Sequence, residues 1–156
     1  MIALALCLSA WASVVDARSR TIPNPSCALI AVCGLALQAT RKLAPRVLEA
    51  LVPEAAVMAS LGEPLACAAW GAGVLVCGVG AELALRSWTG RTGLGLGDVK
   101  LLAAWACVIG RMVVPALAIS CLLGATWAIA RRERTFAMGP WITVGTALAL
   151  LLAAVL

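Results

Sequence analysis

The stretch MVVPALAISCLLGATWAIA, from Met112 to Ala130, contains no charged residue. The hydrocarbon core of a bilayer is about 30 Å thick and an α-helix rises about 1.5 Å per residue, so roughly 20 apolar residues cross it. The apolar residues here are continuous and do not alternate with polar ones, which indicates a helix and not a strand of a membrane barrel. The stretch therefore predicts a membrane-spanning helix.

The composition of the whole chain agrees with this reading. Hydrophobic residues make up 63% of the 156 positions, charged residues 12%, and the mean hydropathy is +1.04. A soluble domain is roughly half apolar and a quarter charged, so this chain cannot cover itself with polar surface in water. We predict an all-α, polytopic transmembrane helix bundle. Because no polar stretch is long enough to form a second domain, residues 1–156 are expected to form a single domain.

Five further apolar stretches bring the predicted total to about six helices. They are Met1–Val15, Thr21–Thr40, Pro64–Ala81 with a continuation past Glu82 to Leu85, Leu101–Gly110 and Ala137–Leu156. Arg111 and Pro115 are expected to cut the fourth of these six helices short. The segment Val47–Leu61 contains two glutamates and a proline, and it predicts a loop or an interfacial helix, with a seventh span as the alternative.

The N-terminal stretch has a second interpretation, as a cleaved signal peptide ending near Ser13. It has no basic residues at its start, which a signal peptide requires. Cleavage would also leave Asp16 at a free end, without a helix to hold it. We therefore favour a retained first helix.

Basic residues divide unequally between the two sides of the predicted bundle. If the first helix ends in the cytoplasm, the inner loops hold eight of them, namely Arg18, Arg20, Arg86, Arg91, Lys100, Arg131, Arg132 and Arg134, and the outer loops hold Arg41, Lys42, Arg46 and Arg111. This excess follows the positive-inside rule and predicts a multi-pass protein of the inner (plasma) membrane. Topology then explains the net charge of +5, so we expect the lipid bilayer and not nucleic acid as a partner.

Asp16 lies where the first apolar stretch stops, within the run VVDARSRTIPNP at 14–25. Pro23 forces the preceding residue away from the helical region, and Asn24 is suited to be an N-cap with Pro25 in the first helical position. The resulting rigid turn would hold Asp16 at a fixed depth. The alternative is that Asp16 only pairs with a nearby arginine in a solvated loop.

Asp98 lies in the run GLGLGDVK at 93–100, behind three alternating glycines. Such glycines leave an open backbone that another helix or a peptide can approach. The helix that follows favours a carboxylate at its N-terminus, so the alternative is a common glycine-rich turn with an aspartate cap. Both aspartates of the chain lie at helix ends on the predicted cytoplasmic side. Since a carboxylate at the edge of hydrocarbon is costly, the two are expected to work as a pair.

The remaining residue types exclude several kinds of chemistry. The chain has no histidine, which excludes Ser-His-Asp and Cys-His catalysis. Its seven cysteines all lie in apolar segments and form no Cys-x-x-Cys pair, so no zinc site and no other cofactor is expected.

Two motifs carry a family resemblance. Asp16 followed by Arg20-Thr21-Ile22-Pro23-Asn24, with Gly95-Leu96-Gly97-Asp98-Val99-Lys100 downstream, resembles the type IV prepilin peptidases, which are membrane aspartic proteases of the Gly-x-Gly-Asp class. The stretch Phe136-Ala137-Met138-Gly139-Pro140 is similar to the Phe-Gly-Pro sequence before the last helix of that family, although two residues separate Phe136 from the glycine. The resemblance implies that Asp16 and Asp98 are catalytic. It also implies that the residues of the surrounding motifs support the catalytic pair, namely Pro23, Asn24, Gly95, Gly97, Lys100, Gly139 and Pro140.

The resemblance also implies a mechanism and a substrate. Two adjacent carboxylates share one proton, so the ionised one activates a water while the protonated one polarises the scissile carbonyl. The substrate would be a prepilin or pseudopilin, whose basic leader precedes an apolar helix, cleaved at the cytoplasmic face. The chain lacks the paired Cys-x-x-Cys motifs and cytoplasmic domain of the methylating members. It therefore looks like the short, peptidase-only branch of the tight-adherence (Flp) pilus systems, with archaeal preflagellin peptidases as a similar short branch.

Two other functional classes remain as alternatives. A small proton-coupled transporter could use both aspartates as a proton relay, but this function places the acids near the middle of the membrane. A non-catalytic subunit of a pilus or secretion assembly would need no aspartate pair.

Overall fold

The computed structural model describes residues 1–43, 63–90, 95–132 and 137–155. Within these ranges the chain is all-helical, which confirms the predicted fold class. The α-helices are α1 (Ile2–Ser19), α2 (Asn24–Leu43), α5 (Pro64–Thr89), α6 (Leu96–Ile109), α7 (Val113–Arg131) and α8 (Gly139–Val155), with a short 3-10 helix η1 (Gly110–Met112). The predicted loop or interfacial helix at Val47–Leu61, and Phe136, lie outside the described residues.

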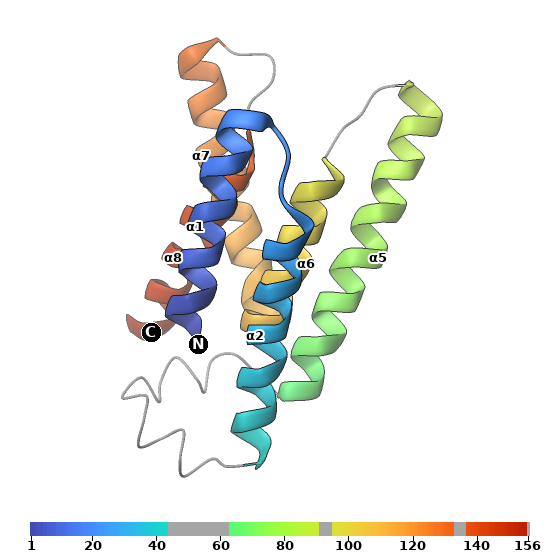
Figure 1. Cartoon of the computed structure of the whole chain (residues 1–156). Coiled ribbons are helices and arrows are strands. Elements are labelled where there is room, and N and C mark those ends of the chain that lie inside the picture. The colour runs from blue at the N-terminus through green and yellow to red at the C-terminus, as the bar shows by residue number, and fades with distance from the viewer. Residues whose placement is uncertain (44–62, 91–94, 133–136, 156) are drawn as a thin grey trace.

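The helices form an up-and-down bundle (Figure 1). Helices α1, α5 and α7 run toward the upper end in this view, and α2, α6 and α8 run toward the lower end, where both termini lie. The described residues contain four stretches long and apolar enough to cross a membrane, with α6, η1 and α7 counted as one stretch from Leu96 to Arg131. Helix α8 is a shorter apolar helix. The chain is therefore a multi-pass membrane protein.

Several helix ends differ from the predicted ones. Helix α1 continues past Val15 to Ser19, so Asp16 lies inside its last turn and not beyond its end. Helix α6 already begins at Leu96, which places Asp98 in its first turn. Pro115 does not shorten α6, because η1 separates the two helices and Pro115 lies in the first turn of α7, where no N–H is needed.

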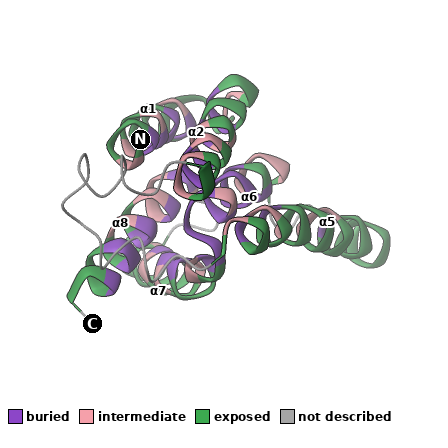
Figure 2. Cartoon of the chain, turned by 90° about the horizontal axis from the view of Figure 1, so that it is seen from below, coloured by how far each residue is buried: buried purple, intermediate pink, exposed green. Residues whose placement is uncertain are grey.

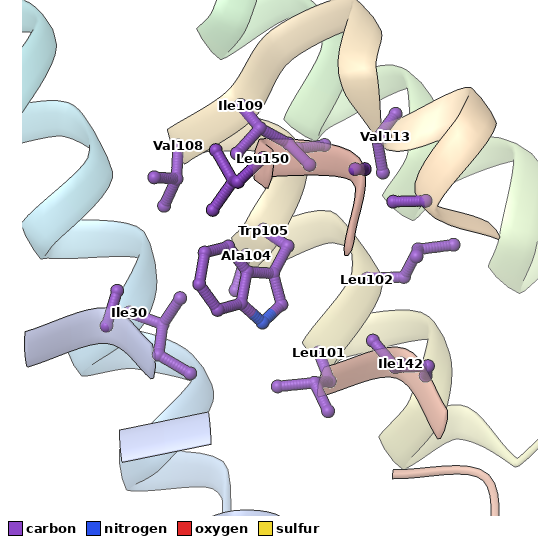
Figure 3. Packing of buried hydrophobic residues seen from close by; sticks show 14 of the residues in the cluster. Ile30, Leu101, Leu102, Ala104, Trp105, Val108, Ile109, Val113, Ile142 and Leu150 are labelled. Carbon is purple, nitrogen blue, oxygen red and sulfur yellow. The ribbon is translucent and has the colours of Figure 1, made fainter. Parts of the chain in front are cut away.

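Helix α6 is the centre of the bundle. Trp105 is fully buried and lies among side chains from α2, α6, α7 and α8, including Ile30, Val113 and Leu150 (Figure 3). Helices in lipid associate through close packing, to which small residues contribute. A Cβ at Gly34 of α2 would lie 2.9 Å from the backbone of Cys107, so the glycine lets α2 and α6 touch directly.

Helix α5 is the peripheral helix. It packs against α6 and projects from the bundle, with most of its residues exposed (Figure 2). In a membrane these exposed apolar residues face lipid. Helix α5 packs closely on α6 but contacts α2 only lightly. The face of the bundle between α2 and α5 is therefore less covered than the face formed by α1, α7 and α8.

Basic residues gather at the helix ends as predicted. Arg18, Arg86 and Arg131 lie in the last turns of α1, α5 and α7, which end together at the upper side of Figure 1. Arg41 and Lys42 lie in the last turn of α2, at the opposite end. Asp16 and Asp98 share the end that carries the larger group.

Candidate active site

Asp16 is buried in the last turn of α1, and its side chain has only 5% of its surface exposed. The helix stops one turn later, where Arg20 takes a left-handed conformation and donates its backbone N–H to the carbonyl of Asp16 at 2.7 Å. The burial excludes the alternative that Asp16 lies in a solvated loop. A carboxylate near the C-terminus of its own helix is electrostatically unfavourable, so Asp16 needs compensation from elsewhere.

The N-terminus of α8 supplies that compensation. Gly139, the first residue of α8, donates its backbone N–H to Oδ2 of Asp16 at 3.0 Å. A Cβ at Gly139 would lie 2.8 Å from the same oxygen and 3.2 Å from Cβ of Asp16, so only glycine permits this approach. The positive end of the α8 dipole thus faces the carboxylate. Pro140 follows as the second residue of α8, a position that proline tolerates.

Asp98 is half-buried and occupies the third position of α6, after Gly95 as N-cap. Its carboxylate accepts a hydrogen bond from the backbone N–H of Gly95, as the acidic member of a capping box does. A Cβ at Gly95 would lie 3.0 Å from Oδ2 of Asp98. Asp98 is therefore a cap, as the alternative interpretation held, and this role also fixes the direction of its carboxylate.

The turn between α1 and α2 brings the two motifs together. A Cβ at Gly97 would lie 3.2 Å from Cβ of Ile22, so the glycine lets the turn rest directly on the start of α6. Lys100 then donates from Nζ to Oδ1 of Asn24 at 3.1 Å. Asn24 is the first residue of α2, and Pro23, one residue earlier, accepts the Ser26 hydroxyl at 2.7 Å. Asn24 thus links α2 to α6, where the sequence predicted an N-cap.

As a result, Asp16 in the last turn of α1 and Asp98 in the first turn of α6 lie at the same end of the bundle. Their carboxyl groups are close enough to interact electrostatically. One is held at the positive end of α8 and the other at the positive end of α6. In general, two carboxyl groups that influence each other can act as acid and base toward a water molecule. Within the described residues, no three His, Cys, Asp or Glu side chains gather as a metal-binding group.

A cluster of buried hydroxyl groups lies one turn below Asp16, and the sequence did not predict it. The Thr143 hydroxyl shares hydrogen bonds with the hydroxyls of Ser9 at 2.6 Å and Ser13 at 2.7 Å. Trp105 donates its indole N–H to the Ser9 hydroxyl at 3.0 Å. The cluster joins α1, α6 and α8, the three helices that hold Asp16, Asp98 and Gly139. Its signal in the sequence is the spacing of Ser9, Ser13 and Asp16, which places all three on one face of a helix.

A third carboxylate, Glu82 of α5, is also fully buried. Its Oε1 accepts a hydrogen bond from Nε of Arg86 at 2.7 Å, as an ion pair one turn apart. One turn below Glu82, Gly78 packs on Val99, the neighbour of Asp98. Helix α5 therefore packs against the start of α6 through Gly78 and Val99, next to Asp98.

Comparison with known proteins adds one finding. A model of the type IV leader peptidase family matches residues 3–129, a range that contains both aspartates and ends before Gly139. No curated protein and no solved structure matches the chain.

Proposed function

Because the chain belongs to the type IV leader peptidase family, we propose that it is an aspartic endopeptidase that uses Asp16 and Asp98 as its catalytic pair. The observation that carries this proposal is the placement of the two carboxyl groups at the same end of the bundle: Asp16 accepts the first N–H of α8, and Asp98 lies in the first turn of α6. An acid pair at one end of the membrane also favours a peptidase over a proton relay, which needs acids near the middle.

The proposed reaction is direct hydrolysis of a peptide bond. The ionised carboxylate removes a proton from a water molecule as the water oxygen attacks the scissile carbonyl carbon. The protonated carboxyl donates its proton to the carbonyl oxygen, which gives a tetrahedral gem-diol. The carboxyl that took the water proton then donates it to the leaving nitrogen, the other carboxylate takes a hydroxyl proton back from the gem-diol, and the C–N bond breaks. The Gly139 N–H orients Asp16, and the Gly95 N–H orients Asp98.

We propose prepilins or pseudopilins as substrates, with the basic leader removed on the cytoplasmic side. Arg18, Arg86 and Arg131 lie in the last turns of their helices, at the end of the bundle that holds the aspartates. By the positive-inside rule, this end is expected to face the cytoplasm. We further propose that one transmembrane domain performs cleavage without methylating the new N-terminus, as in the short branch similar to the tight-adherence pilus enzymes.

The test is cleavage of candidate prepilins in membranes by the wild type and by Asp16→Asn and Asp98→Asn. Asparagine keeps the shape of aspartate and removes its titratable group. A matched control is Glu63→Gln, the same type of change at an exposed position beside the start of α5, at the other end of the bundle. We expect each aspartate variant to insert and to lose cleavage by a factor of at least about 1,000, with the control unchanged. Cleavage that survives either aspartate change would refute the pair.

A further inference from the structure

A groove opens on the less covered side of the bundle, between α2, α5 and α6. Its volume is about 550 Å³, within the range of binding pockets. Asn24 and Lys100 form one end, and every other lining residue is apolar or a cysteine. Ala28, Leu35, Ala72 and Leu75 line it and are exposed on the outer surface, so the groove opens toward lipid.

The groove follows the helices into the membrane. Its lining on α2 extends from Asn24 to Leu35, which corresponds to roughly 16 Å of helix, or half of the hydrocarbon core. Its lining on α6 extends from Lys100 to Cys107. An occupant of the groove would therefore be an elongated apolar group lying along the helix axes.

The polar end of the groove adjoins the candidate active site. Lys100 follows Asp98 by two residues, and its Nζ bonds Asn24 across the mouth. Cys27, one turn after Asn24 in α2, is buried and also lines this end of the groove. A chain that left the groove at this end would thus emerge near Asp98, at the end of the bundle that also holds Asp16.

The groove wall favours a helix over a lipid chain. More than half of its lining is alanine or glycine, including Ala28 and Ala31 of α2, Ala68, Gly71 and Ala72 of α5, and Ala104 of α6. Small residues let a second helix bring its backbone close, and this is the main way that helices recognise each other in lipid. A flexible acyl chain gains less from such a surface.

We propose that this groove binds the apolar membrane helix of the precursor and so presents the bond before that helix to Asp16 and Asp98. The inference rests on the proposed peptidase function and names the part of the substrate that the enzyme holds. It assigns recognition of the mature segment to the membrane-embedded wall formed by α2, α5 and α6, apart from the catalytic carboxylates.

Photo-crosslinking tests the inference without requiring cleavage. A benzoylphenylalanine replaces Ala72, which lines the groove, or Ala69 of the same helix, which lines a different surface with Trp70 and Cys77. Both variants carry Asp16→Asn and are illuminated in membranes with a prepilin that the wild type cleaves. We expect a crosslink to the precursor's apolar helix from position 72 and not from position 69. Crosslinks from both positions, from neither, or to lipid alone would overturn the inference.

A kinetic test uses the same pair of positions in the active enzyme. Ala72→Trp fills the groove, and Ala69→Trp makes the same change outside it. We expect Ala72→Trp to raise KM for the precursor about tenfold with little change in kcat, because it removes binding that is made equally before and during the reaction. Ala69→Trp should stay within about twofold of the wild type. Equal effects of the two changes would reject the groove while leaving the peptidase function established by the wild-type cleavage.

Discussion

The backbone N–H of Gly139 donates to Oδ2 of Asp16 at 3.0 Å, although the two residues are 123 positions apart in the chain. The bond connects the first residue of α8 to the last turn of α1. It gives a buried carboxylate both a donor and the positive end of a helix, which its own helix cannot provide. The direction of the Asp16 side chain therefore depends on where α8 begins.

Gly139→Ala should impair catalysis while leaving the fold intact. The added Cβ would lie 2.8 Å from Oδ2 of Asp16, so the carboxylate or the start of α8 must move. Misplacement of a catalytic group by about 1 Å can lower kcat about 100-fold. The measurement is kcat for precursor cleavage. Gly73→Ala is the control, because a Cβ there meets nothing within 4 Å; a loss below twofold at Gly139 would contradict the assigned role.

Gly97→Val should separate the turn at Ile22 from the start of α6. Even a Cβ at this position would lie 3.2 Å from Cβ of Ile22, and valine adds two further carbons. Overpacking of this kind lowers the free energy of unfolding by about 1–3 kcal/mol. Unfolding in detergent and cleavage activity should both decline. Gly80→Val, at a position with open space, controls for valine in a membrane helix, and equal stabilities of the two variants would argue against the contact.

Trp105→Phe should weaken the buried hydroxyl cluster without opening a large cavity. It removes the indole N–H that donates to the Ser9 hydroxyl at 3.0 Å. Hydrogen bonds between membrane helices contribute about 0.6 kcal/mol on average and up to about 1.7 kcal/mol. Thermal unfolding should show a loss of at least this size, because the smaller ring also leaves part of the buried site unfilled, and Trp88→Phe, at an exposed position, should show none.

A double-mutant cycle separates this bond from packing. If Trp105 acts through Ser9, the losses from Trp105→Phe and Ser9→Ala will add to more than the loss in the double variant. Strict additivity would show that the indole N–H contributes nothing through Ser9.

Labelling of single cysteines should establish which side the aspartates face. In a variant without the seven native cysteines, Ser87→Cys reports on the end of α5 beside the site, and Lys42→Cys reports on the opposite end. A membrane-impermeant maleimide added to intact cells should label position 42 and should reach position 87 only after lysis. The reverse pattern would place the candidate site outside the cytoplasm.

The sequence could predict the helices because their signal is local. Stretches without charge, such as Met112–Ala130, leave the backbone no alternative to a helix in lipid. The helix ends were harder to predict, because each end depends on the backbone conformation of one residue. Helix α1 passes Val15 and the charged residues that follow, and it ends only where Arg20 turns left-handed.

The parts of the site that depend on tertiary contacts were harder to predict from the sequence. Asp16 and Asp98 could be singled out from the sequence, because an acidic side chain at the edge of an apolar segment is energetically costly and indicates a function. The link from Asn24 to Lys100 and the packing of Ile22 on Gly97 required the positions of α2 and α6. Ser9 and Thr143 were overlooked, because a hydroxyl in an apolar helix gives no sign of its partner on another helix.

The bond between Gly139 and Asp16 also sets an order of events during synthesis. A ribosome adds roughly 5–20 residues per second, so the 123 positions between the two partners correspond to a delay of roughly 6–25 s. During this time α1 is already made, and its carboxylate has no N-terminus of α8 beside it. If Asp16 acts in catalysis as proposed, the chain inserts into the membrane with an incomplete site, and the site is completed only when α8 is inserted.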